Sequence, residues 1–303
     1  MRARIAFPLF TILVLAAAFS PRPAAAGPWG LQKGEWYANL EGSNFVSDTY
    51  LADGGARLDS GLVVEERALR SEIEMGFKRH TTLLFGLPAL SSTHRDNKVQ
   101  GTATGFQDAR FGMRYSLTNA KTAAAAVELV WNGPSGYNRK LDSLGIELGE
   151  GLQELVADLQ VGTAIQTRGF VEGSFGYGRR FLGIGQRTSD AYVPGDPHTA
   201  KYQWADRLHM SADLALWLGS NWLASGRYRG QITLSHGALE PDENYHLFGP
   251  ELHYRFDERI DMFAGTWSTA SGKNTLHFDQ YYLGLAFRKN KLGRLQGYLG
   301  GTQ

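Results

Sequence analysis

Residues 105–117 read GFQDARFGMRYSL, and apolar and polar side chains alternate along this stretch. One parity carries Ala109, Phe111, Met113, Tyr115 and Leu117, and the other carries Phe106, Asp108, Arg110, Gly112, Arg114 and Ser116. A helix would mix these two sets around its surface, whereas a strand places each set on its own face. The stretch therefore predicts a strand with one apolar face and one polar, charged face.

The same period of two recurs along the chain and predicts about 12 strands, joined in turn by short turns and longer loops. These strands cover residues 34–46, 64–77, 80–91, 105–117, 121–132, 153–166, 169–182, 203–218, 221–235, 245–256, 259–270 and 277–288. The predicted long loops are 47–63, 92–104, 133–152, 183–202, 236–244 and 271–276. An even number of long strands with this connectivity is typical of a bacterial outer-membrane β-barrel, whose closure pairs every backbone group. The predicted fold is therefore all-β, a transmembrane antiparallel β-barrel. A β-propeller or large sandwich would not explain connections that alternate in length.

The first 26 residues have the three parts of a secretory signal peptide. Arg2 and Arg4 form a basic start, residues 5–19 are almost wholly apolar, and three alanines at 24–26 supply a cleavage site. A membrane anchor is the alternative, but the apolar run is too short and the cleavage site follows it directly. We expect Sec-type export and a bacterial outer-membrane location. The predicted organisation is a signal peptide at 1–26, a barrel at 27–288 and a basic periplasmic tail at 289–303.

Composition excludes several other classes of protein. The chain of 303 residues has 20% charged and 12% aromatic residues, a formal charge of +1, 37 glycines and no cysteine. Aromatic residues at this level argue against disorder. The balanced charge lacks the basic excess that is typical of a nucleic-acid-binding protein. The lack of cysteine excludes disulfides and thiolate metal sites. The mean hydropathy of -0.29 resembles that of a soluble protein because the average combines two faces of opposite character.

The polar face predicts a lumen lined with charges of both signs, which is not a single-sign selectivity ring. One interpretation is an ion-pair network that braces or fills the lumen, and the other is a polar conduit whose side chains touch a solute. The candidate lumen or solute-contact residues are Asp108, Arg110, Arg114, Glu128, Asp158, Arg207, Arg227, Arg229, Glu251 and Arg255. The inward parity also carries many of the glycines, which leave room inside curved strands.

The stretch 105–117 also resembles the signature strand of the phenol meta-pathway outer-membrane protein family, through its opening Gly, its acid and its alternating arginines before a Tyr. Residues 249–256 and 282–287 are similar to the closing strands of that family. The resemblance implies an outer-membrane transporter that passes small aromatic or hydrophobic compounds. The resemblance supplies no established binding residues, and within this stretch only Asp108, Arg110 and Arg114 are carried as candidates. The sequence departs from the usual barrel end, because Phe287 is followed by further, partly basic residues.

The leading functional hypothesis is a channel that passes small molecules by passive diffusion. The alternatives are a structural or surface-interaction barrel with a filled lumen and an outer-membrane lipid hydrolase. His209, Ser211 and Asp213 share one strand face, but alternate residues lie roughly 7 Å apart, too far for direct contact. We therefore predict no enzyme activity, no catalytic residue, no cofactor and no metal site. The expected partners are outer-membrane lipid, a small-molecule solute and the barrel-assembly machinery, with no nucleic acid.

Overall fold

The computed structural model describes residues 28–52, 54–96, 99–119, 123–135, 152–166, 168–182, 205–234 and 243–289. The strands are β1 Trp36–Leu51, β2 Arg57–Lys78, β3 Thr81–Gly86, β4 Ala89–Arg95, β5 Gln100–Phe106, β6 Ala109–Asn119, β7 Ala123–Gly133, β8 Leu152–Ile165, β9 Gly169–Leu182, β10 Arg207–Trp217, β11 Trp222–Thr233, β12 Asn244–Arg255, β13 Ile260–Lys273 and β14 Thr275–Lys289. No helix in these ranges is long and apolar enough to cross a bilayer.

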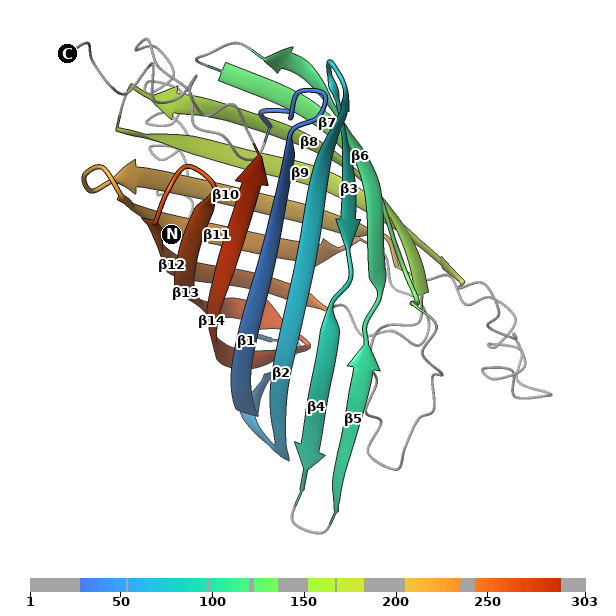
Figure 1. Cartoon of the computed structure of the whole chain (residues 1–303). Helices are drawn as coiled ribbons and strands as arrows, with labels where there is room; N and C mark the ends of the chain where they lie inside the picture. The colour runs from blue at the N-terminus through green and yellow to red at the C-terminus, as the bar shows by residue number, and fades with distance from the viewer. Residues whose placement is uncertain are drawn as a thin grey trace, which may run out of the picture.

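The strands form one closed antiparallel sheet (Figure 1). Closure is made by β1, which pairs with β14 through Ala38 and Phe287 and with β2 through Ala38 and Ile73. β3 and β4 lie end to end along β2, and their partners β6 and β5 lie end to end beside them. The strand segments therefore build twelve barrel strands, which confirms the predicted fold and strand number.

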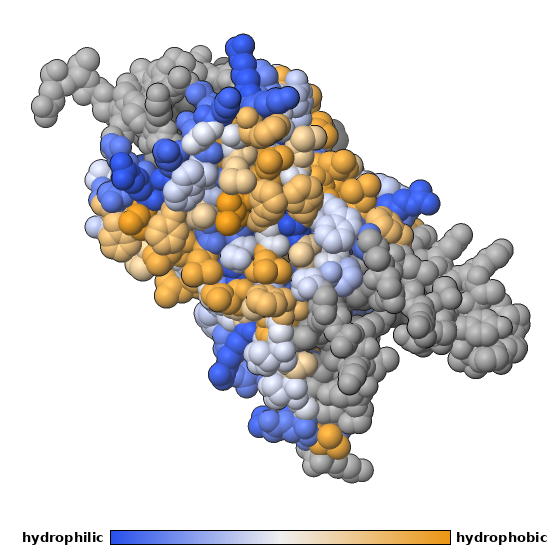
Figure 2. Space-filling view, turned by 45° about the vertical axis from the view of Figure 1, so that its right-hand side comes forward, coloured by the Kyte–Doolittle hydropathy of each residue, from blue (hydrophilic) through white to orange (hydrophobic). Residues whose placement is uncertain are grey.

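The predicted alternation is also confirmed by the burial of β6. Phe111, Met113, Tyr115 and Leu117 point outward and are 46–53% exposed, as lipid-facing side chains of an isolated chain must be. Gly112, Arg114 and Ser116, which alternate with them, are buried. In Figure 2, apolar side chains gather across the middle of the barrel wall and hydrophilic side chains lie toward its ends.

Two of the predicted strands are interrupted. The strand at 80–91 breaks at Leu87 and Pro88, between β3 and β4, and the strand at 105–117 breaks at Gln107 and Asp108, between β5 and β6. Proline has no N–H to donate to a sheet ladder. The backbone N–H of Gln107 bonds instead to the Pro88 carbonyl, at 2.8 Å. Both breaks therefore lie side by side in the wall (Figure 1).

Three of the predicted long loops are wrong, because strands extend through them. β1 extends to Leu51 and β2 begins at Arg57; the Ala52 N–H bonds to the Ala56 carbonyl at 2.9 Å, and Gly55 has φ 74°. β4 and β5 form a hairpin closed by a bond from the Asp96 N–H to the Val99 carbonyl. β13 and β14 are joined through Asn274 alone, at φ 53°. Most of the predicted loops 133–152, 183–202 and 236–244 lies outside the described residues.

At the opposite end of the barrel short connections join β2 to β3, β8 to β9, β10 to β11 and β12 to β13, as predicted. We call this the short-turn end. The predicted turn at 118–120 differs, because β6 continues to Asn119 and residues 120–122 are outside the described ranges.

Candidate functional site

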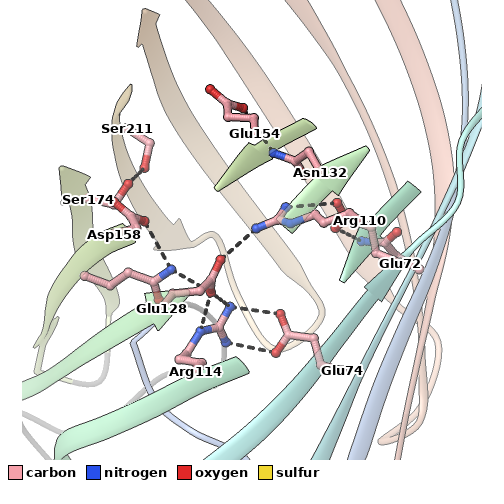
Figure 3. A network of polar contacts seen from close by, with 12 residues as sticks. Glu72, Glu74, Arg110, Arg114, Glu128, Asn132, Glu154, Asp158, Ser174 and Ser211 are labelled. Atoms are coloured by element: carbon pink, nitrogen blue, oxygen red, sulfur yellow. Dashed lines mark hydrogen bonds and ion pairs between the residues drawn. The ribbon is translucent and has the colours of Figure 1, made fainter. Parts of the chain in front are cut away.

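The inward faces of β2, β6 and β7 bring five charged side chains together inside the barrel (Figure 3). We call this set the β6–β7 network; it consists of Glu72, Glu74, Arg110, Arg114 and Glu128. Arg114 donates to both oxygens of Glu74, at 2.9 and 3.2 Å, and its Nη2 lies 2.8 Å from Glu128 Oε2. Arg110 Nη2 lies 2.7 Å from Glu128 Oε1, and its Nη1 lies 3.5 Å from Glu72. Charges of both signs are thus paired along one wall.

Strand register creates this network. Arg114 lies opposite Glu128 in the β6–β7 ladder, and on the other side it lies opposite Thr82 of β3. Arg114 and Glu128 are 6% and 2% exposed, so their charges require the partners that the register supplies. The guanidinium of Arg114 contacts a carboxylate on each side, so its charge is balanced by Glu74 and Glu128.

Polar side chains extend the network toward β8 and β10. Gln160 donates from Nε2 to Glu128 at 2.9 Å and contacts Asp158 at 3.4 Å. Further along, Glu154 contacts His209 Nε2 at 3.0 Å and accepts from Asn132 at 3.2 Å. Polar contacts therefore continue along the wall from β2 to β10, although Asp158 Oδ1, Gln160 Oε1 and Glu172 Oε2 are buried there without a hydrogen-bond partner.

A second group lies further around the barrel wall, separated from the network by β8, β9 and β10 on one side and by β1 on the other. We call it the β11–β14 cluster; it consists of Arg227, Arg229, Glu251, Trp267 and Tyr282. Arg227 Nη1 donates to Glu251 at 2.5 Å and to the Tyr282 hydroxyl at 3.3 Å. The Trp267 ring is 3% exposed and stacks near Tyr282, with ring centroids 6.5 Å apart.

Both arginines of the cluster face this indole ring. The Cζ atom of Arg227 lies 5.0 Å from the centroid of Trp267, and that of Arg229 lies 4.7 Å from it. Asp213 adds an ion pair to Arg227 at 3.5 Å, and His253 contacts Glu251 at 2.7 Å. Arg227 is thus held by carboxylates and by the ring, whereas Arg229 is held by the ring.

The predicted site residues do not form one site. Arg110, Arg114, Glu128 and Asp158 come together in or beside the β6–β7 network, and Arg227, Arg229 and Glu251 come together in the β11–β14 cluster. The other three lie apart. Arg207 is 3.8 Å from Glu243, Arg255 is 3.4 Å from Asp261, and Asp108 lies at the break between β5 and β6.

Arg255 belongs to the short-turn end rather than to the middle of the lumen. Its guanidinium carbon lies 4.5 Å from the Trp217 ring centroid, and Asp261 also pairs with Arg288. These contacts join β10, β12, β13 and β14, so they brace the wall.

Sequence reasoning missed a segment that precedes the first strand and lies inside the barrel. Pro28, Trp29 and Leu31 are all buried. The Leu31 N–H donates to Thr82 Oγ1 at 3.1 Å, and the Trp29 ring meets Phe170 edge-on at 6.3 Å. These partners lie next to the short turns, so residues 28–31 pack across the lumen at that end. The signal in the sequence was a Pro-Trp-Gly-Leu run at 28–31, which begins one residue after Gly27 opens the predicted mature chain.

Two glycines make this close approach feasible. A Cβ at Gly76 would lie 1.9 Å from the carbonyl oxygen of Gln32, and a Cβ at Gly162 would lie 2.8 Å from Pro28 and Trp29. The backbone of Gly76 also bonds the segment from both of its groups: its oxygen accepts from Gly34 at 3.1 Å and its N–H donates to Glu35 at 2.9 Å. The lack of a side chain at these positions therefore serves the seating of residues 28–35.

The polar residues considered for catalysis each have a different partner. Ser211 bonds to Ser174 at 2.8 Å, His209 to Glu154, and Asp213 to Arg227. Within the described ranges there is no group of three or more His, Asp or Glu side chains placed to hold a metal ion.

Known proteins resemble this chain in structure. No protein-family model and no curated protein matches the sequence. Among solved structures, the COG4313 outer membrane channel from Pseudomonas putida F1 superposes with a TM-score of 0.66 at 11% identity, covering 88% of this chain and 100% of that chain. The NanC porin superposes with a TM-score of 0.48 at 9% identity, covering 82% of this chain and 98% of its own. The first likeness shows that the chain shares the fold of an outer-membrane barrel.

Proposed function

We propose that this chain is a bacterial outer-membrane channel that passes small molecules by passive diffusion. The observation that carries the proposal is the exposure of charged side chains that point into the closed barrel. The side chains of Arg70, Glu72 and Arg110 are 40%, 48% and 41% exposed, although they face inward. Water therefore reaches the lumen at their level, while the outer face of the same strands is apolar.

The barrel fold supports an outer-membrane location, and the likeness to an outer membrane channel favours transport. The family resemblance of residues 105–117 supports aromatic or hydrophobic compounds as solutes. We place the short-turn end in the periplasm, because short turns in such barrels face that side. We propose no catalytic role for any residue.

A liposome-swelling assay with the full chain tests this proposal. We expect liposomes that contain the folded barrel to take up small neutral and charged aromatic solutes faster than empty liposomes. Folding is checked by heat-modifiable migration in gels, so that a negative result is not due to unfolded protein. A folded barrel that accelerates the entry of no solute would contradict the proposal.

One observation favours the second candidate, a structural barrel with a filled lumen. Residues 28–31 pack across the short-turn end and narrow the path there. Removal of residues 28–33 from the exported chain distinguishes the two candidates. If the intact barrel is impermeable and the shortened one is permeable, the segment is a plug. If both are permeable, the intact chain is already a channel.

A further inference from the structure

Arg229 differs from every other arginine of the two charged walls. Its side chain lies in the lumen and is exposed, and its guanidinium faces the buried Trp267 ring at 4.7 Å. Among the residues that the structure describes, no carboxylate lies within ion-pair distance of it. Arg114 and Arg227, by comparison, each bind two carboxylates.

The contact with Trp267 leaves N–H donors of Arg229 available. A guanidinium carries five N–H donors, and an attraction to the face of one aromatic ring does not use them all. The remaining N–H groups can bind an oxyanion in the bidentate geometry that arginine favours. Trp267 fixes the orientation without neutralising the charge.

The surrounding charges do not cancel this property. The charged groups that act on Arg229 have both signs: Arg227 and Arg70 are bases, and Glu72 and Asp213 are acids. Both acids already have a guanidinium partner, since Glu72 lies 3.5 Å from Arg110 and Asp213 lies 3.5 Å from Arg227. An anion that enters the lumen would therefore find unused N–H donors on Arg229, and the nearby carboxylates are already paired with other arginines.

From these contacts we infer that Arg229 is an anion-binding residue of the lumen and that the channel takes small organic acids in their anionic form. This inference rests on the proposed channel function and names its class of solute. An aromatic carboxylate or sulfonate combines a charge for Arg229 with an apolar body that matches the proposed solutes.

Binding is measured first, because it does not depend on transport. The folded full chain in detergent is titrated by calorimetry with benzenesulfonate, which stays anionic, and with neutral benzenesulfonamide. We expect tighter binding of the sulfonate and a loss of about three- to tenfold in its affinity in Arg229→Gln. Arg67→Gln is the matched control, because Arg67 is 73% exposed on β2 and pairs with Glu65. Equal affinity for the two probes, or unchanged sulfonate affinity in Arg229→Gln, would overturn the inference.

Ion selectivity then connects binding with transport. In planar bilayers under a gradient of sodium benzenesulfonate, the anion-to-cation permeability ratio should fall about threefold in Arg229→Gln and stay unchanged in Arg67→Gln. A ratio that is the same in wild type and Arg229→Gln counts against the inference. A wild-type barrel that binds the sulfonate but carries no current counts against the channel proposal alone.

Discussion

In the β6–β7 network, Arg114 divides its guanidinium between Glu74 and Glu128, whereas in the β11–β14 cluster Arg229 lies against the Trp267 ring. The two arginines face the same lumen from different parts of the wall. Arg114 is buried and its charge is balanced, while Arg229 is exposed and keeps unused donors. The difference separates two roles that look identical in the alternating sequence. Paired charges join strands of the wall, and an arginine held by an aromatic face remains available to a solute.

The largest effect is expected where a paired charge is removed. Glu128→Gln takes a 2% exposed carboxylate away from both Arg110 and Arg114. Of the two arginines only Arg114 is buried, and it would keep Glu74 alone as its carboxylate partner. Removal of one partner of a buried ion pair should lower the free energy of unfolding by about 3–5 kcal/mol. Urea unfolding of the barrel in lipid vesicles, followed by tryptophan emission, measures this change. Glu65→Gln, at an exposed ion pair, should alter stability by no more than about 1 kcal/mol. Equal losses in the two variants would contradict the distinction between buried and surface pairs.

A smaller effect is expected at the short-turn end. The methyl group of Gly76→Ala would overlap the carbonyl oxygen of Gln32 and push residues 28–35 out of the lumen. Overpacking of this kind destabilises a protein by about 1–3 kcal/mol. Faster proteolysis within residues 28–35 and a larger bilayer conductance would report the displacement.

Gly226→Ala is the control for this prediction, because nothing lies within 4 Å of a Cβ built at Gly226. Its protease sensitivity and conductance should match those of the wild type. If the protease sensitivity and conductance of Gly76→Ala also match those of the wild type, the position of residues 28–35 does not depend on the close contact at Gly76.

The smallest change in stability is expected at Arg229. Arg229→Gln removes a contact with an aromatic ring at an exposed position, worth about 0.5–1 kcal/mol. Its unfolding midpoint should lie close to that of the wild type, although its anion selectivity changes. A loss as large as that of Glu128→Gln would mean that Arg229 braces the wall, and the contrast between the two arginines would fail.

The alternation of apolar and polar residues and the positions of the turns were enough to predict the barrel. Within each strand, the residues themselves determine which side chains face lipid and which face the lumen. Strand lengths were underestimated where small polar residues looked like loops. In the β4–β5 hairpin, Ser91 and Thr104 bond across the strands at 3.0 Å, as do Thr93 and Thr102. Such cross-strand pairs stabilise a sheet, but they appear only when the two strands are in register.

The composition of the site could be predicted only in part for the same reason. An inward position follows from parity, so the ten candidate residues could be named from the sequence. Partners do not follow from it: Arg114 binds Glu74, which is 40 residues away, and Arg229 faces Trp267 two strands further on. The seat of residues 28–31 was likewise hidden, because glycines that appear only to open the lumen accommodate a separate segment.

The most direct test of the account is the accessibility of Arg229 in a conducting barrel. The chain has no cysteine, so Arg229→Cys provides a single thiol. We expect a water-soluble, positively charged methanethiosulfonate reagent to change the current through reconstituted Arg229→Cys barrels and to leave the wild-type current unchanged. A current through Arg229→Cys that the reagent does not alter would contradict the claim that this position lines a solute path.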